Sequence, residues 1–391
     1  MASEYDLAFS PNSFDEAGSF KLLELPPEVC ALIESAATAT HPTTLTIKGR
    51  PNEDAVLCTR DTTYAMRSVV LSNSVLVVTP SEGDLQFEKD KADGAEDGGE
   101  REAVVVRDQI NEVIELSKCV PKLHQLAGLL RGREYEGEEE DEMEDEEQDA
   151  QGTQPLTYQA VRDSVQASDA ELDRGLRDRR ILQLNGHLRP ISPPYLLRLL
   201  ELVLNQLVAH GLDPAAAPLE TLTTALADAD DVPRAVSGQV LGWFGALAGG
   251  RWAMDARAIV REIGLGILRA HRHDPVIESA LLARWREAAT DAFADLCEMS
   301  LLAGNYIATA ALDGSAGPLR YFPSSALPVD PAARFAELFL TRARWKGDEI
   351  APFLADIAVD AKERDRLLLK YARATTTPEG IWYTARAQYA A

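Results

Sequence analysis

The stretch "RFAELFLTRARWKGDEIAPFLADIAVDAKERDRLLLKYARATTTPEGIWYTAR" (Arg334–Arg386) decides the fold of the C-terminal region. Apolar residues recur at helical spacing in three successive segments, of which the second carries Ile350, Phe353, Leu354 and Ile357. Pro378-Glu379-Gly380 then supplies turn residues between two short extended arms. Three helices followed by a hairpin predict a winged-helix module over residues 330–391.

The same order precedes this module along the chain. Residues 120–192 read as three helices and a hairpin, with a capping box at Ser168 and Glu171 and the hairpin dipeptide Asn185-Gly186. Residues 195–329 are mainly helical, with an extended pair near their end. We therefore expect tandem winged helices. The first covers 119–194, with an acidic loop insertion at 134–151, and a less clearly bounded middle region covers 195–329.

Residues 1–118 are rich in short strands, such as "TLTIKG", "AVLCT", "TYAMRSV", "SVLVVTP", "AVVVRD" and "NEVIEL". Short strands at close spacing are typical of an antiparallel barrel or sandwich. The fold class is therefore α+β, with an N-terminal antiparallel β-barrel-like domain followed by tandem winged-helix modules. Two alternatives stay open for the barrel: it closes by itself, or strands from another subunit complete it.

Charge and cysteine usage narrow the class of protein. The 391 residues carry a net charge of −24, and Glu134–Asp149 alone holds 12 acidic residues and no basic one. Removing those 12 charges leaves −12, which permits a local basic patch but not a surface coated by DNA. Four separated cysteines fit a reducing compartment. No signal peptide or membrane-spanning stretch is visible, so we expect a soluble, intracellular protein.

Motifs for catalysis or cofactor binding are missing from the sequence. It contains no phosphate-binding GxxxxGK[ST] loop, no nucleophile signature and no HExxH. The glycines of Gly238–Gly250 are read as helix packing and a helix end, and His271 and His273 as cations at a helix end. We expect no enzyme, no cofactor and no metal.

Several segments, in order, carry a resemblance to a known family. They are "FKLLELPPEVCALIE", "TLTIKGRPNEDAVLCTRDTTYAMRSVVLSNSVLVV", "SDAELDRGLRDRRILQLNGHLRPI" and "RFAELFLTRARWKGDEIAPFLADI". Together they resemble the sister chromatid cohesion protein Dcc family over nearly the whole chain. The dense acidic insertion and the loosely matching middle modules depart from the family pattern.

The resemblance implies a non-catalytic accessory subunit of an alternative replication factor C clamp loader. In that family the N-terminal strands form a barrel with a small accessory subunit and the C-terminal tail of the large subunit. The family also implies recruitment of DNA polymerase epsilon, loading or unloading of the sliding clamp PCNA, and contact of the C-terminal winged helices with single- and double-stranded DNA. The expected location is the nucleus.

The leading hypothesis is thus a scaffold that bridges a clamp loader to polymerase and DNA at replication forks in sister chromatid cohesion. The alternative is a stand-alone winged-helix transcription regulator, which requires an N-terminal domain that is stable in isolation and base-specific DNA contacts. A third hypothesis is an enzyme whose active site has no recognisable motif.

Two sets of residues are predicted to form interfaces. The subunit interface is expected among apolar strand residues, namely Leu45, Ile47, Val56, Leu57, Leu76 and Val78. The DNA contact is expected from cations on one face of the last module's third helix, with a further arginine on its wing: Lys362, Arg366, Lys370, Arg373 and Arg386. No set of side chains suited to base reading accompanies them, so contacts to phosphate are expected.

Overall fold

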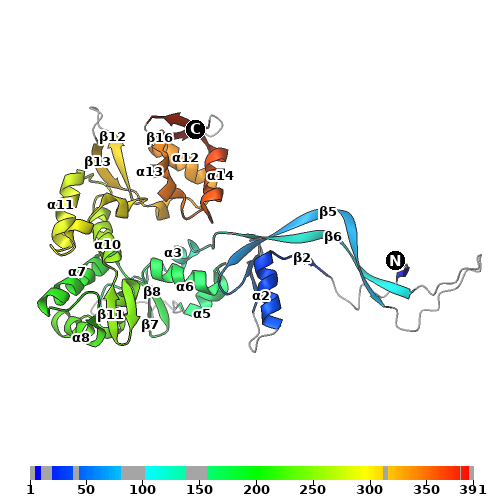
Figure 1. Ribbon diagram of the computed structural model, residues 1–391, viewed down its shortest axis with the longest axis horizontal. Coiled ribbons are helices and arrows are strands. Elements are labelled where there is room, and N and C mark those ends of the chain that lie inside the picture. The colour runs from blue at the N-terminus through cyan, green and yellow to red at the C-terminus, as the bar shows by residue number, and fades with distance from the viewer. Residues whose placement is uncertain are drawn as a thin grey trace, which may run out of the picture. The chain divides into compact units, whose positions relative to one another are not determined.

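A computed structural model describes residues 5–9, 20–37, 44–80, 102–137, 156–310, 316–378 and 380–386 (Figure 1). The chain divides into two compact units. Unit 1 comprises Met1–Thr59 and Thr63–Lys118, and unit 2 comprises Arg60–Thr62 and Cys119–Ala391. Strands dominate the described part of unit 1, and helices with short hairpins dominate unit 2, which confirms an α+β protein. In the described part of the chain, no helix is long and apolar enough to cross a membrane.

Unit 1 is built on one long antiparallel pair of strands, labelled β5 and β6 in Figure 1. The described residues form a six-stranded sheet in the order β1-β6-β5-β4-β3, with β2 also paired to β6. β1 and β2 run parallel to β6, and the other pairs are antiparallel. The strands are β1 (Tyr5–Phe9), β2 (Leu22–Glu24), β3 (Thr46–Lys48), β4 (Val56–Cys58), β5 (Thr63–Pro80) and β6 (Glu102–Lys118).

This sheet corrects the expected barrel in three respects. The predicted strands at 63–69 and 74–80 are one continuous strand, as are those at 103–108 and 111–116. The sheet is mixed rather than antiparallel, and within the described residues it does not close on itself. The polar segment Ser72–Ser74 does not end β5, because its side chains are exposed and Ser74 bonds across the ladder to Asn111 (Oγ to Oδ1, 2.8 Å).

The apolar core of unit 1 is small among the described residues. Its buried cluster contains Val29, Leu57, Tyr64 and Leu116, contributed by helix α2 (Pro27–Ala37), β4, β5 and β6. α2 begins at a proline, which the first helical turn tolerates. A Lys118–Glu28 ion pair (2.9 Å) joins α2 to β6, and the hydrogen bond from Lys118 lowers the pKa of Glu28. Exposed pairs contribute little, so apolar packing holds α2 in place.

Unit 2 repeats one order of elements four times in its described residues: helices, then a hairpin. We call the four repeats modules 1 to 4. Module 1 comprises α3 (Gln125–Leu129), α5 (Tyr158–Ser164), α6 (Asp169–Asp178), β7 (Ile181–Leu184) and β8 (His187–Pro190). Module 2 comprises α7 (Pro193–Ala209), β9 (Ala217–Pro218), α8 (Leu219–Asp230), α9 (Arg234–Trp243), β10 (Gly245–Ala248) and β11 (Arg251–Met254).

Module 3 comprises α10 (Ala256–Arg269), α11 (Glu278–Ala288), the 3-10 helices η1 (Ala294–Leu296) and η2 (Met299–Leu302), β12 (Tyr306–Ala310) and β13 (Ala316–Tyr321). Module 4 comprises η3 (Ser324–Ala326), α12 (Pro331–Thr341), β14 (Arg344–Lys346), α13 (Gly347–Ile350), η4 (Ala351–Leu354), α14 (Ala361–Tyr371), β15 (Ala372–Thr377) and β16 (Gly380–Ala385). In modules 2 and 4 a short strand after the first helix adds to the hairpin, giving the orders β10-β11-β9 and β14-β16-β15.

Module 1 confirms its strongest sequence signals. Ser168 and Glu171 form the capping box of α6, and Asn185 and Gly186 both have positive φ in the turn between β7 and β8. The acidic insertion is corrected at its start, because Tyr135 is buried and bridges to Ile191. Residues 138–155, which hold most of that insertion, lie outside the described residues.

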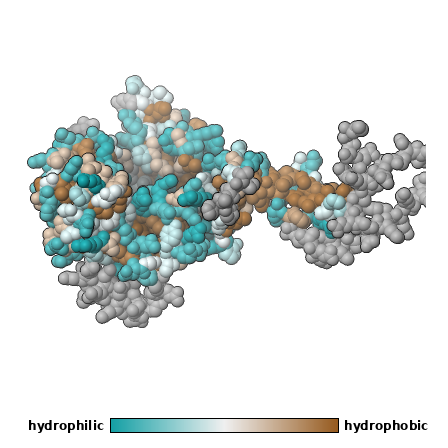
Figure 2. Space-filling view, turned by 60° about the horizontal axis from the view of Figure 1, so that its bottom comes forward, coloured by the Kyte–Doolittle hydropathy of each residue, from teal (hydrophilic) through white to brown (hydrophobic). Residues whose placement is uncertain are grey.

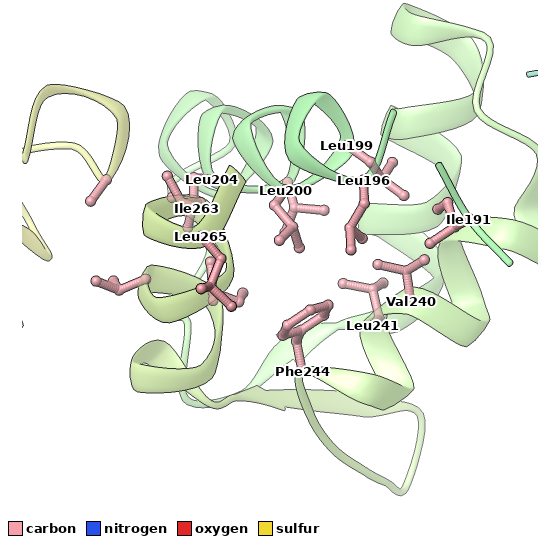
Figure 3. Packing of buried hydrophobic residues seen from close by; sticks show 14 of the residues in the cluster. Ile191, Leu196, Leu199, Leu200, Leu204, Val240, Leu241, Phe244, Ile263 and Leu265 are labelled. Carbon is pink, nitrogen blue, oxygen red and sulfur yellow. The ribbon is translucent and has the colours of Figure 1, made fainter. Parts of the chain in front are cut away.

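Modules 2 and 3 share a single apolar core, part of which Figure 3 shows. Side chains from α7, α9 and α10 point into it, among them Leu200, Leu241 and Ile263. One element was missed in the sequence: β10 and β11 form a hairpin whose turn is Gly249-Gly250, both with positive φ. Those glycines therefore belong to a turn rather than to helix packing.

A buried carboxylate links module 1 to module 3. Glu262 on α10 is almost fully buried and lies 3.3 Å from Arg180 Nη2 and 3.0 Å from Arg269 Nη2. Arg180 lies between α6 and β7 of module 1, and its guanidinium also lies over the ring of Phe244, 4.3 Å from the centroid. Two arginines thus compensate the buried charge and join three modules at one point.

Module 4 has a core of its own. Phe335, Leu338, Ile350, Leu354 and Leu368 are buried in it, as the apolar spacing predicts. Trp345 lies in β14, and Asp348 lies inside α13, whose N-cap is Lys346.

Candidate subunit and nucleic-acid interfaces

The six residues predicted to form the subunit interface fall into two groups. Val56 and Leu57 on β4 are buried, Leu57 as part of the core of unit 1, and Leu45 is half-buried against the same core. The others are exposed: Ile47 by 62%, Leu76 by 38% and Val78 by 42%. The structure therefore leaves Ile47, Leu76 and Val78 accessible to a partner.

The exposed apolar surface of unit 1 is larger than the sequence indicated. Val70, which is 75% exposed, and Val75 lie on β5 in addition to the predicted pair. Figure 2 shows hydrophobic residues gathered along this ribbon. The continuous apolar run Val75–Val78 was the available signal in the sequence. We call the exposed surface formed by Ile47 on β3 and by Val70, Val75, Leu76 and Val78 on β5 the apolar ribbon face; it covers both sides of the sheet, because the adjacent side chains of Val75 and Leu76 point in opposite directions.

A groove of about 650 Å³ lies on the same sheet. Apolar side chains, among them Phe20, Met66, Ile110 and Ile114, line it together with polar ones. Its polar lining is already bonded within unit 1: Ser68 Oγ donates to Glu112 (2.6 Å), and the Phe20 amide donates to Asp108 (2.9 Å). The groove thus offers a partner mainly apolar contacts.

Three of the five predicted DNA-contacting cations lie on α14 with exposed side chains: Lys362, Arg366 and Lys370. The opposite side of the helix buries Leu368 and Tyr371. α14 begins with an Asp360 cap, whose carboxylate accepts from the Glu363 amide at 2.7 Å. Among the described residues, neither Lys362 nor Arg366 forms an ion pair, whereas Arg364 pairs with Asp365 at 3.0 Å. Arg366 and Lys362 can therefore meet an anion from outside.

The other two predicted cations lie elsewhere than expected. Arg373 is exposed but belongs to β15, because α14 ends at Tyr371. Arg386 follows the last residue of β16 and lies at the foot of the hairpin, where its Nε donates to the carbonyl of Ala372 (3.3 Å). The helical projection that grouped Arg373 with α14 continues the helix two residues too far.

Metal-ligating side chains do not gather in the part of the chain that the structure describes. No group of three or more His, Cys, Asp or Glu side chains there could hold a metal ion. His271, at the end of module 3's first helix, uses its Nδ1 in a 2.9 Å contact with the carbonyl oxygen of Asp274. The chemistry that these surfaces offer is apolar contact in unit 1 and cationic contact in module 4.

The comparisons with known proteins all find the same family. A family model described as sister chromatid cohesion protein Dcc1 matches residues 20–354. The chain is 24% identical to "Sister chromatid cohesion protein DCC1" of Homo sapiens over 94% of its own length and 89% of the relative's. It is 24% identical to the Xenopus tropicalis protein of the same name, over 92% and 87% of the two chains.

The family match covers unit 1 and most of unit 2 and ends within module 4, before α14. The pairwise matches cover more than nine-tenths of the chain. Both agree with the resemblance found in the sequence, which is thereby confirmed. The chain belongs to the sister chromatid cohesion protein Dcc1 family.

Proposed function

We propose that this protein is a non-catalytic subunit of an alternative replication factor C clamp loader that acts at replication forks in sister chromatid cohesion. In this role it bridges the loader to DNA polymerase epsilon and DNA while PCNA is loaded or unloaded. Membership of the cohesion protein family supports the cellular role. The partners follow from the family resemblance, and the proposed location is the nucleus.

The apolar ribbon face is the observation that carries this proposal. Burying an apolar side chain contributes about 1.5–3 kcal/mol relative to leaving it exposed, so five exposed aliphatic residues on one small unit indicate a missing partner. Unpaired edges add to this argument, because β3 ends the sheet on one side in the described residues and an added strand can hydrogen-bond to it. We propose that the small accessory subunit and the large subunit's tail complete the sheet into a shared barrel.

We further propose that the four modules are winged helices and that module 4 contacts DNA through α14. The order helix, strand, helix, helix, hairpin in modules 2 and 4 supports the fold. The exposed Lys362, Arg366 and Lys370 support a contact with phosphates, which depends on charge rather than on sequence. A bridging role requires both ends of the chain: unit 1 for the complex and module 4 for DNA.

Replacing Leu76 and Val78 with Asp tests the subunit interface. We expect the double variant to lose co-purification with the loader subunits, because two charges would face the partner's apolar surface without compensation. The matched control is Leu340→Asp, which changes a residue of α12 in unit 2 that is 85% exposed. This control should assemble normally. Retained assembly by a folded Leu76→Asp/Val78→Asp variant would refute the shared sheet.

A further inference from the structure

The outer face of the β14-β16-β15 sheet in module 4 carries an aromatic residue among cations. The register places Lys346, Trp382 and Thr375 side by side across the three strands, and Arg344, Thr384 and Arg373 in the next such row. Side chains alternate between the faces of a strand, so the members of these two rows share one face. Neither Trp382, Arg344 nor Lys346 was identified as a site residue in the sequence.

Burial shows that this face points outward. Trp345 and Tyr383, the residues paired between the two rows, belong to the core of module 4. Arg344 and Arg373 are exposed, and Lys346 and Trp382 are partly exposed. The face therefore presents one indole ring and three cationic side chains to solvent.

The indole and one cation are already paired with each other. The guanidinium carbon of Arg344 lies 4.3 Å from the centroid of the Trp382 ring, within the range of a cation–π contact. Among the described residues, neither Arg344 nor Arg373 has an acidic partner, and Lys346 lies 3.8 Å from the exposed carboxylate of Asp348. Two of the three cations thus remain available to an anion, in a chain whose net charge is −24.

We propose that this face, which we call the tryptophan face, binds single-stranded nucleic acid by stacking a base on the Trp382–Arg344 pair, with a neighbouring phosphate held by Arg373. Surfaces for single strands combine cations that follow the backbone with aromatic rings on which bases stack. Bases also stack on arginine guanidinium planes. Stacking needs an unpaired base, so the tryptophan face selects single strands, whereas α14 offers only charge.

This inference rests on the proposed function only in that module 4 contacts nucleic acid. The family resemblance already implies contact with single- and double-stranded DNA, and the new element is a second surface that binds the single strand by base stacking. α14 would hold duplex phosphates, and the tryptophan face would hold the unpaired strand that accompanies a duplex end at a replication fork. The two surfaces share no residue once Arg373 is placed in β15.

The test measures binding of the purified full-length chain to a fluorescent oligo-dT strand, to an abasic strand of equal length and to a duplex. We expect Trp382→Ala to weaken oligo-dT binding about tenfold, since stacking one base contributes a factor of roughly five to a hundred. Duplex and abasic-strand binding should change less than twofold. Trp382→Phe should restore most of the affinity, and Arg344→Gln should weaken oligo-dT binding more than duplex binding.

Arg366→Glu/Lys370→Glu is the matched variant on α14, and it should weaken duplex binding while leaving the preference for oligo-dT over the abasic strand unchanged. If the wild-type chain binds oligo-dT and the abasic strand equally, base stacking is refuted whether or not Trp382→Ala folds. Duplex binding without any strand binding would overturn the tryptophan face alone. A chain that binds no nucleic acid would overturn both this inference and the proposed DNA contact.

Discussion

Unit 1 and module 4 each pack helices against a sheet, but they bury their apolar residues differently. The described residues of unit 1 have a buried cluster of four apolar residues, whereas the cluster of module 4 holds twelve, eleven from the module itself and Ile307 from β12 of module 3. Unit 1 exposes the apolar ribbon face, while the apolar residues of module 4 converge on Phe335 and Trp345. Module 4 is therefore complete without a partner, and unit 1 is not.

The difference follows from how each region closes its sheet. In module 4 the three short strands pack one face on helices, and the other face carries polar, cationic and aromatic residues. In unit 1 the pair β5–β6 is 18 and 17 residues long, and one helix, α2, contributes to its small core. A long ribbon cannot bury both faces with one short helix, so its apolar residues indicate an interface with another chain.

Separating the two regions gives the largest expected effect. Residues 1–118 expressed alone should not yield a stable monomer, because the apolar ribbon face would stay in water. Residues 119–391 should be soluble and unfold cooperatively, since their cores are complete. Size-exclusion chromatography with light scattering measures both. A monomeric, stably folded 1–118 fragment would contradict the claim that unit 1 needs a partner, and it would favour a stand-alone regulator.

Replacing Arg334 tests how much its buried hydrogen bonds stabilise module 4. Its side chain is buried and donates to the carbonyls of Pro328, Leu327 and Phe353, and it pairs with Asp356. Arg334→Met should lower the free energy of unfolding by about 3–5 kcal/mol, because carbonyls and a carboxylate lose their donors. Thermal and urea unfolding measure the loss.

The matched control for Arg334 is Arg364→Met, which removes a partly exposed arginine paired only with its neighbour Asp365. Surface pairs of this kind contribute about 0–1 kcal/mol. If the two substitutions lower the free energy of unfolding equally, the buried hydrogen bonds of Arg334 do not stabilise module 4.

Neutralising Glu262 is expected to have the smallest effect. Glu262→Gln keeps the volume but removes the charge that pairs with Arg180 and Arg269, so unit 2 should lose about 1–3 kcal/mol of stability. Hydrogen exchange should also show the connection between α6 and β7, and α10, opening more often. Glu298→Gln, in an exposed pair with Arg257 at 3.8 Å, should change the unfolding free energy by less than about 1 kcal/mol. If it destabilises as much as Glu262→Gln, the buried junction has no special role.

The sequence predicted local elements well where one strong local signal decides the conformation. The capping box of Ser168 and Glu171 and the Asn185-Gly186 turn are both present, since each is formed by residues close in the chain. The apolar face of module 4 was predictable for the same reason. Gly249-Gly250 carried a comparable turn signal between short arms, but an overlapping helical spacing obscured it.

The candidate interfaces were only partly predictable. The sequence identified Leu76, Val78, Arg366 and Lys370 as residue types suited to partners, and tertiary structure decided which apolar residues remain exposed. Val56 and Ile47 looked equivalent in the sequence, yet β4 is covered and β3 is an edge. Arg373 was assigned to a helix because periodicity does not mark where α14 ends.

The sequence by itself determined the family, the α+β class and the repeated order of helices and hairpins, because these depend on residue patterns within short stretches. Only the tertiary structure decided that β5 and β6 form one long open ribbon, and that Trp382 shares a face with Arg344 and Arg373. These features depend on strand pairing between residues far apart in the chain. A shift of the pairing register by one residue moves every side chain of a strand to the other face of the sheet. The sequence of one strand does not show which distant residues it pairs with.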